Sequence, residues 1–295
     1  MISVASPTEH DRPATHGARW LCPSCGVPAT TRYCSTCGEE RIGVARGPDD
    51  EARPHPSRSF VSRVLASLRA LASPPGRLTA DWIRGKRVGY LSPLSLFLLV
   101  NVAFFLVQSA SRLGILTWPL SAHLSDDLFG WLTTRLLANY RSGLTVANND
   151  YAQIFNVLES VHAKSLVIVM VPAFAVALRA LLVDRRTPFK GLLTFATHFF
   201  AFALIWLCAL FPTVAVVLYL FVLNGWALPS PHSIDLVVSG LEAGVLGWYL
   251  YEALGIVYGF SRLRRSITTV ALIAVLFLIL KAYHVIVFVV TLYSM

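Results

Sequence analysis

Four cysteines near the N-terminus have the spacing of a metal-binding module. Cys22 and Cys25 form one C-x2-C pair, and Cys34 and Cys37 form a second pair separated from the first by eight residues, each followed directly by glycine. Four thiolates suit tetrahedral zinc, and such a closed site leaves no coordination position for a substrate. The glycines allow the backbone to turn tightly behind each pair. The pattern therefore predicts a small structural zinc ribbon over residues 21–40.

Two other roles for these cysteines are considered. Two disulfides would require an oxidising compartment, and residues 1–20 contain no apolar stretch of the kind found in a secretory signal peptide. A redox pair would be expected beside a strand–helix–strand unit, which the sequence does not indicate. The spacing therefore favours a reduced, cytoplasmic zinc site over either alternative.

The elements that follow the ribbon are those of a membrane protein. Of the 295 residues, 55% are hydrophobic, and the long apolar runs are confined to residues 91–295. This distribution predicts an all-α integral membrane protein with about five transmembrane helices. The expected spans cover about residues 91–110, 165–183, 192–223, 236–260 and 268–292. The third is too long for one upright helix, so Pro212 is expected to kink or divide it.

The segments between the ribbon and the first span are polar and basic. Residues 1–20 are expected to be disordered, residues 41–56 to form a linker, and residues 57–90 to form a basic juxtamembrane segment that begins with an amphipathic helix. That helix either lies in the membrane interface, with anionic headgroups as partners, or packs on the protein itself. Nucleic acid is not the expected partner, because the segment adjoins a span. The cations predicted to contact headgroups are Arg58, Arg63, Arg69, Lys86 and Arg87.

The basic residues also predict an orientation. The short loops 184–191 and 261–266 carry Lys and Arg, whereas the loop 224–235 carries neither. The positive-inside rule is then satisfied with the N-terminus in the cytoplasm and the C-terminus outside. Residues 111–164 become an external connection, in which amphipathic patterns over 124–140 and 151–161 predict helices that lie over the outer face of the bundle.

Ionisable residues within the spans are costly and are candidates for function. His198 and Glu252 are expected at matching depth near the cytoplasmic side. Glu242 and Lys281 are expected to form a buried pair near the outer side. Such residues either form a polar path or hold the helices in register. The membrane positions that we single out are His198, Glu242, Glu252, Lys281 and His284.

Five pieces of the chain, in order, resemble the bacterial zinc-ribbon membrane proteins of domain-of-unknown-function family 3667. They are the paired Cys knuckles, Pro75-Gly76 with Gly85-Lys86-Arg87-x-x-Tyr90-x-x-Pro93, Pro172-Ala173-Phe174-Ala175, His198 with Phe199, Phe200 and Phe202, and Val257-Tyr258-Gly259 before Arg262. The resemblance covers about residues 20–290 and implies residence in the bacterial inner membrane. It implies no reaction, because the family has no established activity.

These observations lead to two functional hypotheses. The first is a non-enzymatic membrane adaptor or assembly factor whose cytoplasmic zinc ribbon docks a soluble protein. The second is a transporter or channel-like protein that uses the intramembrane Glu, Lys and His residues. An enzyme is less favoured, because the sequence has no H-E-x-x-H, Gly-x-Ser-x-Gly or P-loop motif.

Overall fold

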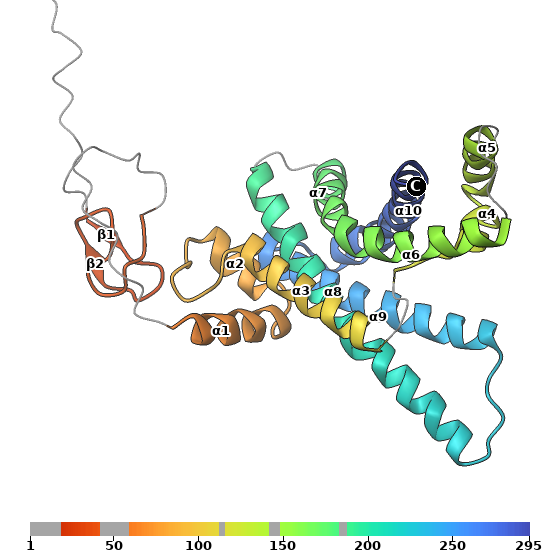
Figure 1. The fold of residues 1–295 in the computed structure, drawn as a ribbon. Coiled ribbons are helices and arrows are strands. Elements are labelled where there is room, and N and C mark those ends of the chain that lie inside the picture. The colour runs from red at the N-terminus through yellow and green to blue at the C-terminus, as the bar shows by residue number, and fades with distance from the viewer. Residues whose placement is uncertain (1–18, 42–58, 112–115, 142–147, 183–187) are drawn as a thin grey trace, which may run out of the picture. The chain divides into compact units, whose positions relative to one another are not determined.

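The computed structural model describes residues 19–41, 59–111, 116–141, 148–182 and 188–295 (Figure 1). The chain forms two compact units. The first contains the residues up to 69 together with 80–92, and the second contains 70–79 together with 93–295. Most of the predicted disordered N-terminus and of the predicted linker lies outside the described residues.

The cysteine ribbon of the first unit is built on a small two-stranded sheet. Strands β1 (Trp20–Leu21) and β2 (Pro28–Ala29) are antiparallel, with Trp20 opposite Ala29. Each Cys pair is followed by a tight turn, in which Gly26 N–H donates to the Cys22 carbonyl and Gly38 N–H donates to the Cys34 carbonyl, both at 2.8 Å. Both glycines have φ of +75°, a conformation that favours glycine.

Two helices precede the apolar part of the chain, α1 (Phe60–Ala72) and α2 (Arg77–Ile83). The predicted amphipathic helix is therefore present. Its apolar residues at the N-terminal end, Phe60, Val61 and Leu65, are each more than 60% exposed. Arg63, one of the polar positions, donates instead to a backbone carbonyl of the same unit, that of Tyr90, at 2.8 Å. The helix thus combines an unpartnered apolar face with internal polar contacts.

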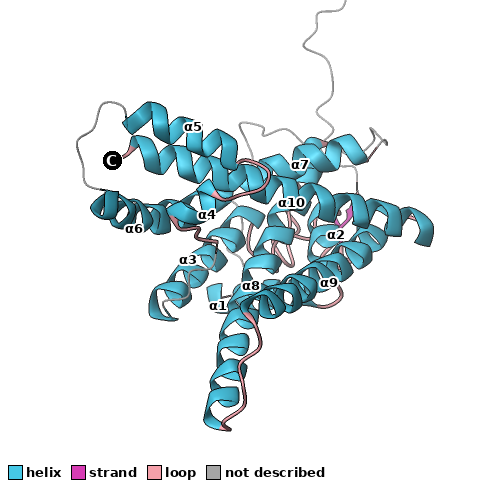
Figure 2. Cartoon of the chain, turned by 90° about the vertical axis from the view of Figure 1, so that its right-hand side faces the viewer, coloured by secondary structure: helices cyan, strands magenta, loops and turns pink. Residues whose placement is uncertain are grey.

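The second unit is helical. Its elements are α3 (Pro93–Ser111), α4 (Leu120–Leu124), α5 (Gly130–Arg141), α6 (Asn148–Leu166), the 3-10 turn η1 (Val167–Val169), α7 (Met170–Leu181), α8 (Phe189–Leu223), α9 (Pro231–Tyr258) and α10 (Arg262–Tyr293). Helices α4, α5 and α6 pack around the C-terminal part of α10 (Figure 2). Leu120, Tyr151, Phe155 and Phe288 form the buried core at that place.

Within the described parts of the chain, five helical stretches are long and apolar enough to cross a membrane. They are Pro93–Ala110, Tyr151–Leu181, Phe189–Leu223, His232–Tyr258 and Arg262–Tyr293. Many large apolar side chains along them are exposed, as expected for surfaces that contact lipid. This pattern indicates a multi-pass membrane protein.

The second span differs from the expectation, and for the third the structure decides between two alternatives. The second stretch begins at Tyr151 rather than at residue 165, because α6 continues through η1 into α7 and its polar residues make internal contacts. The third was expected to be kinked or divided at Pro212, and it is not divided, since α8 runs through Pro212 as one helix. The Thr213 hydroxyl donates to the Ala209 carbonyl at 2.7 Å, which adds a donor in the turn where proline removes one. The predicted helix over 124–140 is broken, since α4 ends at Leu124 and α5 begins at Gly130.

The Pro75-Gly76 turn of the second unit lies directly against helix α9. Gly76 is buried and has φ of +83°. A Cβ atom at this position would lie 2.6 Å from Ala253 Cα, closer than real Cβ contacts allow. Only glycine satisfies both the backbone conformation and this close approach.

Gly76→Ala is therefore expected to destabilise the helical unit strongly. The left-handed conformation and the overlap with Ala253 together should cost about 2–4 kcal/mol. The matched control is Gly244→Ala on α9, where nothing lies within 4 Å of the added methyl group, and which should stay within about 1 kcal/mol of the wild type. Thermal unfolding of the purified protein in detergent measures both. Equal melting temperatures for the two variants would contradict the close packing of this turn.

Candidate functional site

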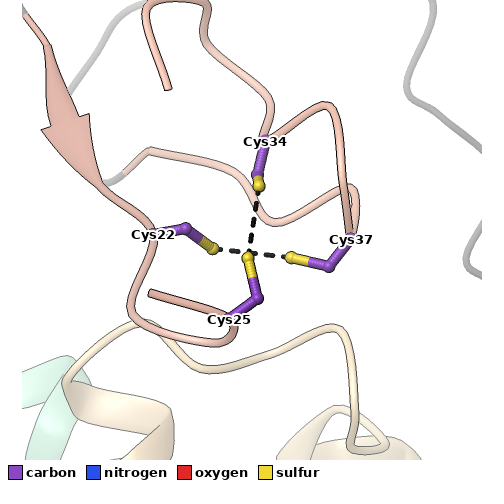
Figure 3. Close-up of side chains that lie close together, drawn as sticks. All are labelled: Cys22, Cys25, Cys34 and Cys37. Carbon is purple, nitrogen blue, oxygen red and sulfur yellow. Dashed lines mark hydrogen bonds between the residues drawn. The ribbon is translucent and has the colours of Figure 1, made fainter. Parts of the chain in front are cut away.

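The four cysteines converge as the spacing predicts. Their sulfur atoms all lie within 4.8 Å of one another, and Figure 3 shows the four side chains pointing toward a common centre. Cys22 Sγ lies 3.4 Å from Cys37 Sγ, and Cys25 Sγ lies 3.5 Å from Cys34 Sγ. These separations are too long for disulfides, which have an S–S length of about 2.05 Å. They approach the spacing of about 3.8 Å between thiolates on a tetrahedral zinc ion. The donor set therefore fits a metal.

The protonation of these thiols is set by burial and by nearby amides. Burial opposes ionisation at Cys34, but the backbone amides of Cys37 and Thr36 and the neighbouring thiols lower the pKa of Cys34 to about 7. Burial raises the pKa of Cys22 and of Cys37. Metal binding requires thiolates, so a metal ion at this site displaces protons.

A buried carboxylate links the ribbon to the chain that precedes α3. Glu39 is only 1% exposed. Its Oε2 atom accepts hydrogen bonds from the Ser24 hydroxyl at 2.5 Å, from Arg87 N–H at 2.9 Å and from Val88 N–H at 3.1 Å. Sequence reasoning missed this residue, because nothing in the pattern distinguishes Glu39 from the neighbouring Glu40. The ribbon is thus attached to residues 87–88 and is not held only by its linker.

The cations predicted to contact lipid headgroups differ in their exposure and in their contacts. Arg58 lies outside the described residues. The guanidinium of Arg63 is partly exposed and donates to the Tyr90 carbonyl at 2.8 and 3.2 Å, an internal contact that the sequence did not indicate. Lys86 lies 3.4 Å from Asp81 and is partly exposed. Arg69 and Arg87 are exposed, and Arg87 lies over the Trp82 ring.

The predicted pair of Glu242 and Lys281 is wrong. Lys281 forms an ion pair with Asp126, which lies between α4 and α5. The side chain of Asp126 is 6% exposed, and that of Lys281 is 18% exposed. Among the described residues, no ion pair involves Glu242. Asp126 was overlooked because its segment was treated as an external connection rather than as a partner of α10.

Lys281 and His284 belong to a larger group of buried and partly buried side chains, which we call the cap cluster. The Trp118 ring stacks on His284 with centroids 4.1 Å apart, and Lys281 Nζ lies 4.5 Å from the Trp118 ring centre. Glu159 Oε1 accepts a hydrogen bond from Trp118 N–H at 2.9 Å and lies 3.8 Å from His123 Nε2. Sequence analysis found two of its members and missed four. The cluster consists of Trp118, His123, Asp126, Glu159, Lys281 and His284.

His198 and Glu252 do not join this group. His198 is fully buried on α8, and its Nδ1 atom lies 2.9 Å from the Thr79 hydroxyl of the same unit. The partner of His198 is thus Thr79 of α2, which lies outside the predicted spans. The His198 Nε2 atom has no hydrogen-bond partner among the described residues. His198 thus has its contact with Thr79, whereas Lys281 and His284 contact Asp126 and Trp118.

Residues 62–105 match the sequence model of a family described as a protein of unknown function (DUF3667). The match agrees with the family inferred from the sequence motifs, although it does not extend over the ribbon. We call residues 62–105 the DUF3667 segment. No curated protein and no solved structure matches the chain.

The DUF3667 segment holds the partners of several residues described above. It contains Arg63, the Gly76 turn, Thr79 and the Arg87-Val88 amides that bind Glu39. It begins within α1 and ends within α3. This segment therefore supplies backbone and side-chain contacts to the ribbon in the first unit and to helices α8 and α9 in the second.

Proposed function

We propose that this chain is a non-enzymatic adaptor or assembly factor of the bacterial inner membrane, with a cytoplasmic zinc ribbon that docks a soluble protein. The observation that carries the proposal is the attachment of the ribbon by Glu39 to residues 87–88. A four-thiolate site has no open position for catalysis. A ribbon fixed by Glu39 to residues 87–88 instead presents a positioned protein surface. The basic loops support a cytoplasmic N-terminus and an external C-terminus.

Anionic lipid headgroups are the second proposed partner. Arg69 and Arg87 are exposed in the unit that also exposes Phe60, Val61 and Leu65 on α1. Apolar residues on one side and cations nearby are typical of a helix that lies in a membrane interface. The adaptor would thus hold its ribbon at the membrane surface rather than at a distance from it.

The docking role is tested with surface variants that preserve the metal site. Leu21 is 70% exposed and Thr30 is also exposed, and both lie on the ribbon. Leu21→Glu is expected to abolish crosslinking of the full-length protein to its soluble partner in intact cells, because it places a charge on an apolar surface. Thr30→Glu adds the same charge at a polar position and should preserve it.

Zinc content and membrane insertion should be equal in both variants and the wild type. If the Leu21→Glu and Thr30→Glu variants crosslink to the same proteins, docking at this surface is contradicted. Absence of any ribbon-dependent crosslink in the wild type would contradict the adaptor role itself.

The cap cluster favours a second candidate function, transport of a small solute or ion. Buried ionisable groups on membrane helices commonly line transport pathways. His123 Nε2 and His284 Nδ1 are buried without a hydrogen-bond partner among the described residues. In a transporter, Lys281 and Asp126 would be required for activity beyond their effect on stability.

A further inference from the structure

The backbone of residues 87–91, which leads into α3, is bound by side chains from two places. Glu39 of the ribbon accepts from Arg87 N–H and Val88 N–H. On the other side, Arg63 of α1 donates to the Tyr90 carbonyl, and Leu91 N–H donates to the Ser67 hydroxyl at 2.8 Å. This segment is irregular and lacks the repeating bonds of a helix or a strand. Its conformation therefore depends on these side chains.

The position of Glu39 depends in turn on the metal knuckles. Glu39 follows the Cys37-Gly38 turn directly, and its own carbonyl accepts from Cys34 N–H at 2.8 Å. Its other side-chain partner, Ser24, lies between Cys22 and Cys25. One local contact of the Glu39 backbone and one of its carboxylate thus come from the two Cys pairs. The metal ion holds the four thiolates together. Without it, we expect the two Cys pairs to lose this arrangement.

We propose that metal binding at the four cysteines is coupled through Glu39 to the conformation of residues 87–88. The backbone segment that precedes α3 would then change its conformation when a thiophilic divalent cation such as zinc binds. The inference rests on the proposed zinc ribbon. It adds that the ribbon holds residues 87–88 through Glu39 only when the metal is bound, and we call this arrangement the clamp. In the metal-bound state, Glu39 supplies an acceptor to both amides. In the metal-free state, the ribbon loosens and both amides lose that acceptor.

Coupling of this kind is reciprocal. If the metal ion favours the docked ribbon, the docked ribbon must favour the metal ion by the same factor. A substitution in the 87–88 segment, outside the ribbon, should therefore weaken metal binding. Couplings between sites in proteins are typically about 5- to 150-fold in affinity, which a competition titration with a zinc chelator resolves.

The experiment uses the full-length protein in detergent and three variants. Val88→Pro removes one donor N–H from the partner segment, and Glu39→Ala removes the acceptor from the ribbon. Both are expected to lower the apparent zinc affinity by about 5- to 150-fold. Glu40→Gln is the matched control, because Glu40 is the adjacent acid in the ribbon and its carboxylate pairs with Arg32 at 2.6 Å instead. It should retain the wild-type affinity.

Hydrogen exchange provides an independent readout if a variant folds poorly. In the wild-type protein, chelation of zinc is expected to remove the protection of the Arg87 and Val88 amides, while amides in the middle of α10 stay protected. Amides 87 and 88 that remain protected without metal would overturn the proposal, as would a wild-type zinc affinity in Val88→Pro. An equal loss of affinity in Glu40→Gln and Glu39→Ala would also overturn it, because the effect would then be one of charge near the thiolates. These outcomes leave crosslinking through Leu21 unaffected, so failure of the clamp is distinguishable from failure of the adaptor role.

Discussion

Cys22→Ser is expected to abolish stoichiometric zinc binding and to unfold the ribbon, while the membrane helices remain intact. The four sulfur atoms lie within 4.8 Å of one another, and the sheet that carries them has only two residues in each strand. So small a module has too little core to be stable without its metal. Structural zinc contributes about 10–16 kcal/mol of apparent binding free energy in comparable modules, so loss of one ligand should be decisive.

Metal analysis of the purified full-length protein and hydrogen exchange of the ribbon amides measure this effect. The wild type should carry one equivalent of zinc and lose protection over residues 20–40 on chelation. Cys208→Ser is the matched control, because this fifth cysteine lies on α8 and is not part of the cluster. A wild-type protein with iron or with no metal would refute the zinc ribbon, and a Cys208→Ser protein that loses its zinc would refute the assignment of ligands.

Lys281→Met is expected to destabilise the second unit by about 3–5 kcal/mol, because it leaves the buried Asp126 carboxylate without its cation. Asp126 also accepts from Phe129 N–H at 3.0 Å and Leu128 N–H at 3.2 Å at the start of α5. The double variant Asp126→Asn with Lys281→Met removes both charges and retains an acceptor oxygen for these amides. It should recover most of the lost stability in detergent.

The sequence alone predicted Glu242 as the partner of Lys281, so Glu242→Gln serves as the control. It should change stability little, because Lys281 pairs with Asp126. If Glu242→Gln proves as harmful as Lys281→Met, or if the effects of Asp126→Asn and Lys281→Met are simply additive, the Asp126–Lys281 pair is refuted. A loss of solute uptake in the stable double variant would favour the transport hypothesis over the adaptor.

The same pair predicts a dependence on pH. Burial raises the pKa of Asp126, but the Lys281 ammonium and the Phe129 and Leu128 amides outweigh it, so that the pKa is lowered overall. The unfolded chain therefore takes up this proton at a higher pH than the folded chain. The contribution of the pair is complete above the ordinary carboxyl range, about pH 4, and is lost as the pH falls through the lowered value. Wild type and Lys281→Met should converge in stability at acid pH.

Several features of this protein were predictable because they depend on residues close together in the chain. The Cys-x2-Cys spacing and its glycines were sufficient to place four thiols together, since each knuckle is a local turn. Apolar runs of sufficient length were sufficient to predict five membrane-crossing helices, because backbone hydrogen bonds within a helix need no distant partner. The second stretch was placed too short, because α6 carries polar residues whose burial depends on other helices.

Other features were decided only by the tertiary structure. Lys281 had an acid on a neighbouring span as its candidate, yet its partner Asp126 comes from a connection that packs against α10. Arg63 is a cation on an amphipathic helix, which predicts contact with lipid headgroups. In the structure its guanidinium also donates to the Tyr90 carbonyl, a contact that the sequence did not indicate. Glu39 is indistinguishable from Glu40 in sequence, but only Glu39 reaches the Arg87 and Val88 amides. A charged side chain pairs with whichever group the fold brings within a few ångströms, and that proximity is set by packing between segments far apart in the chain.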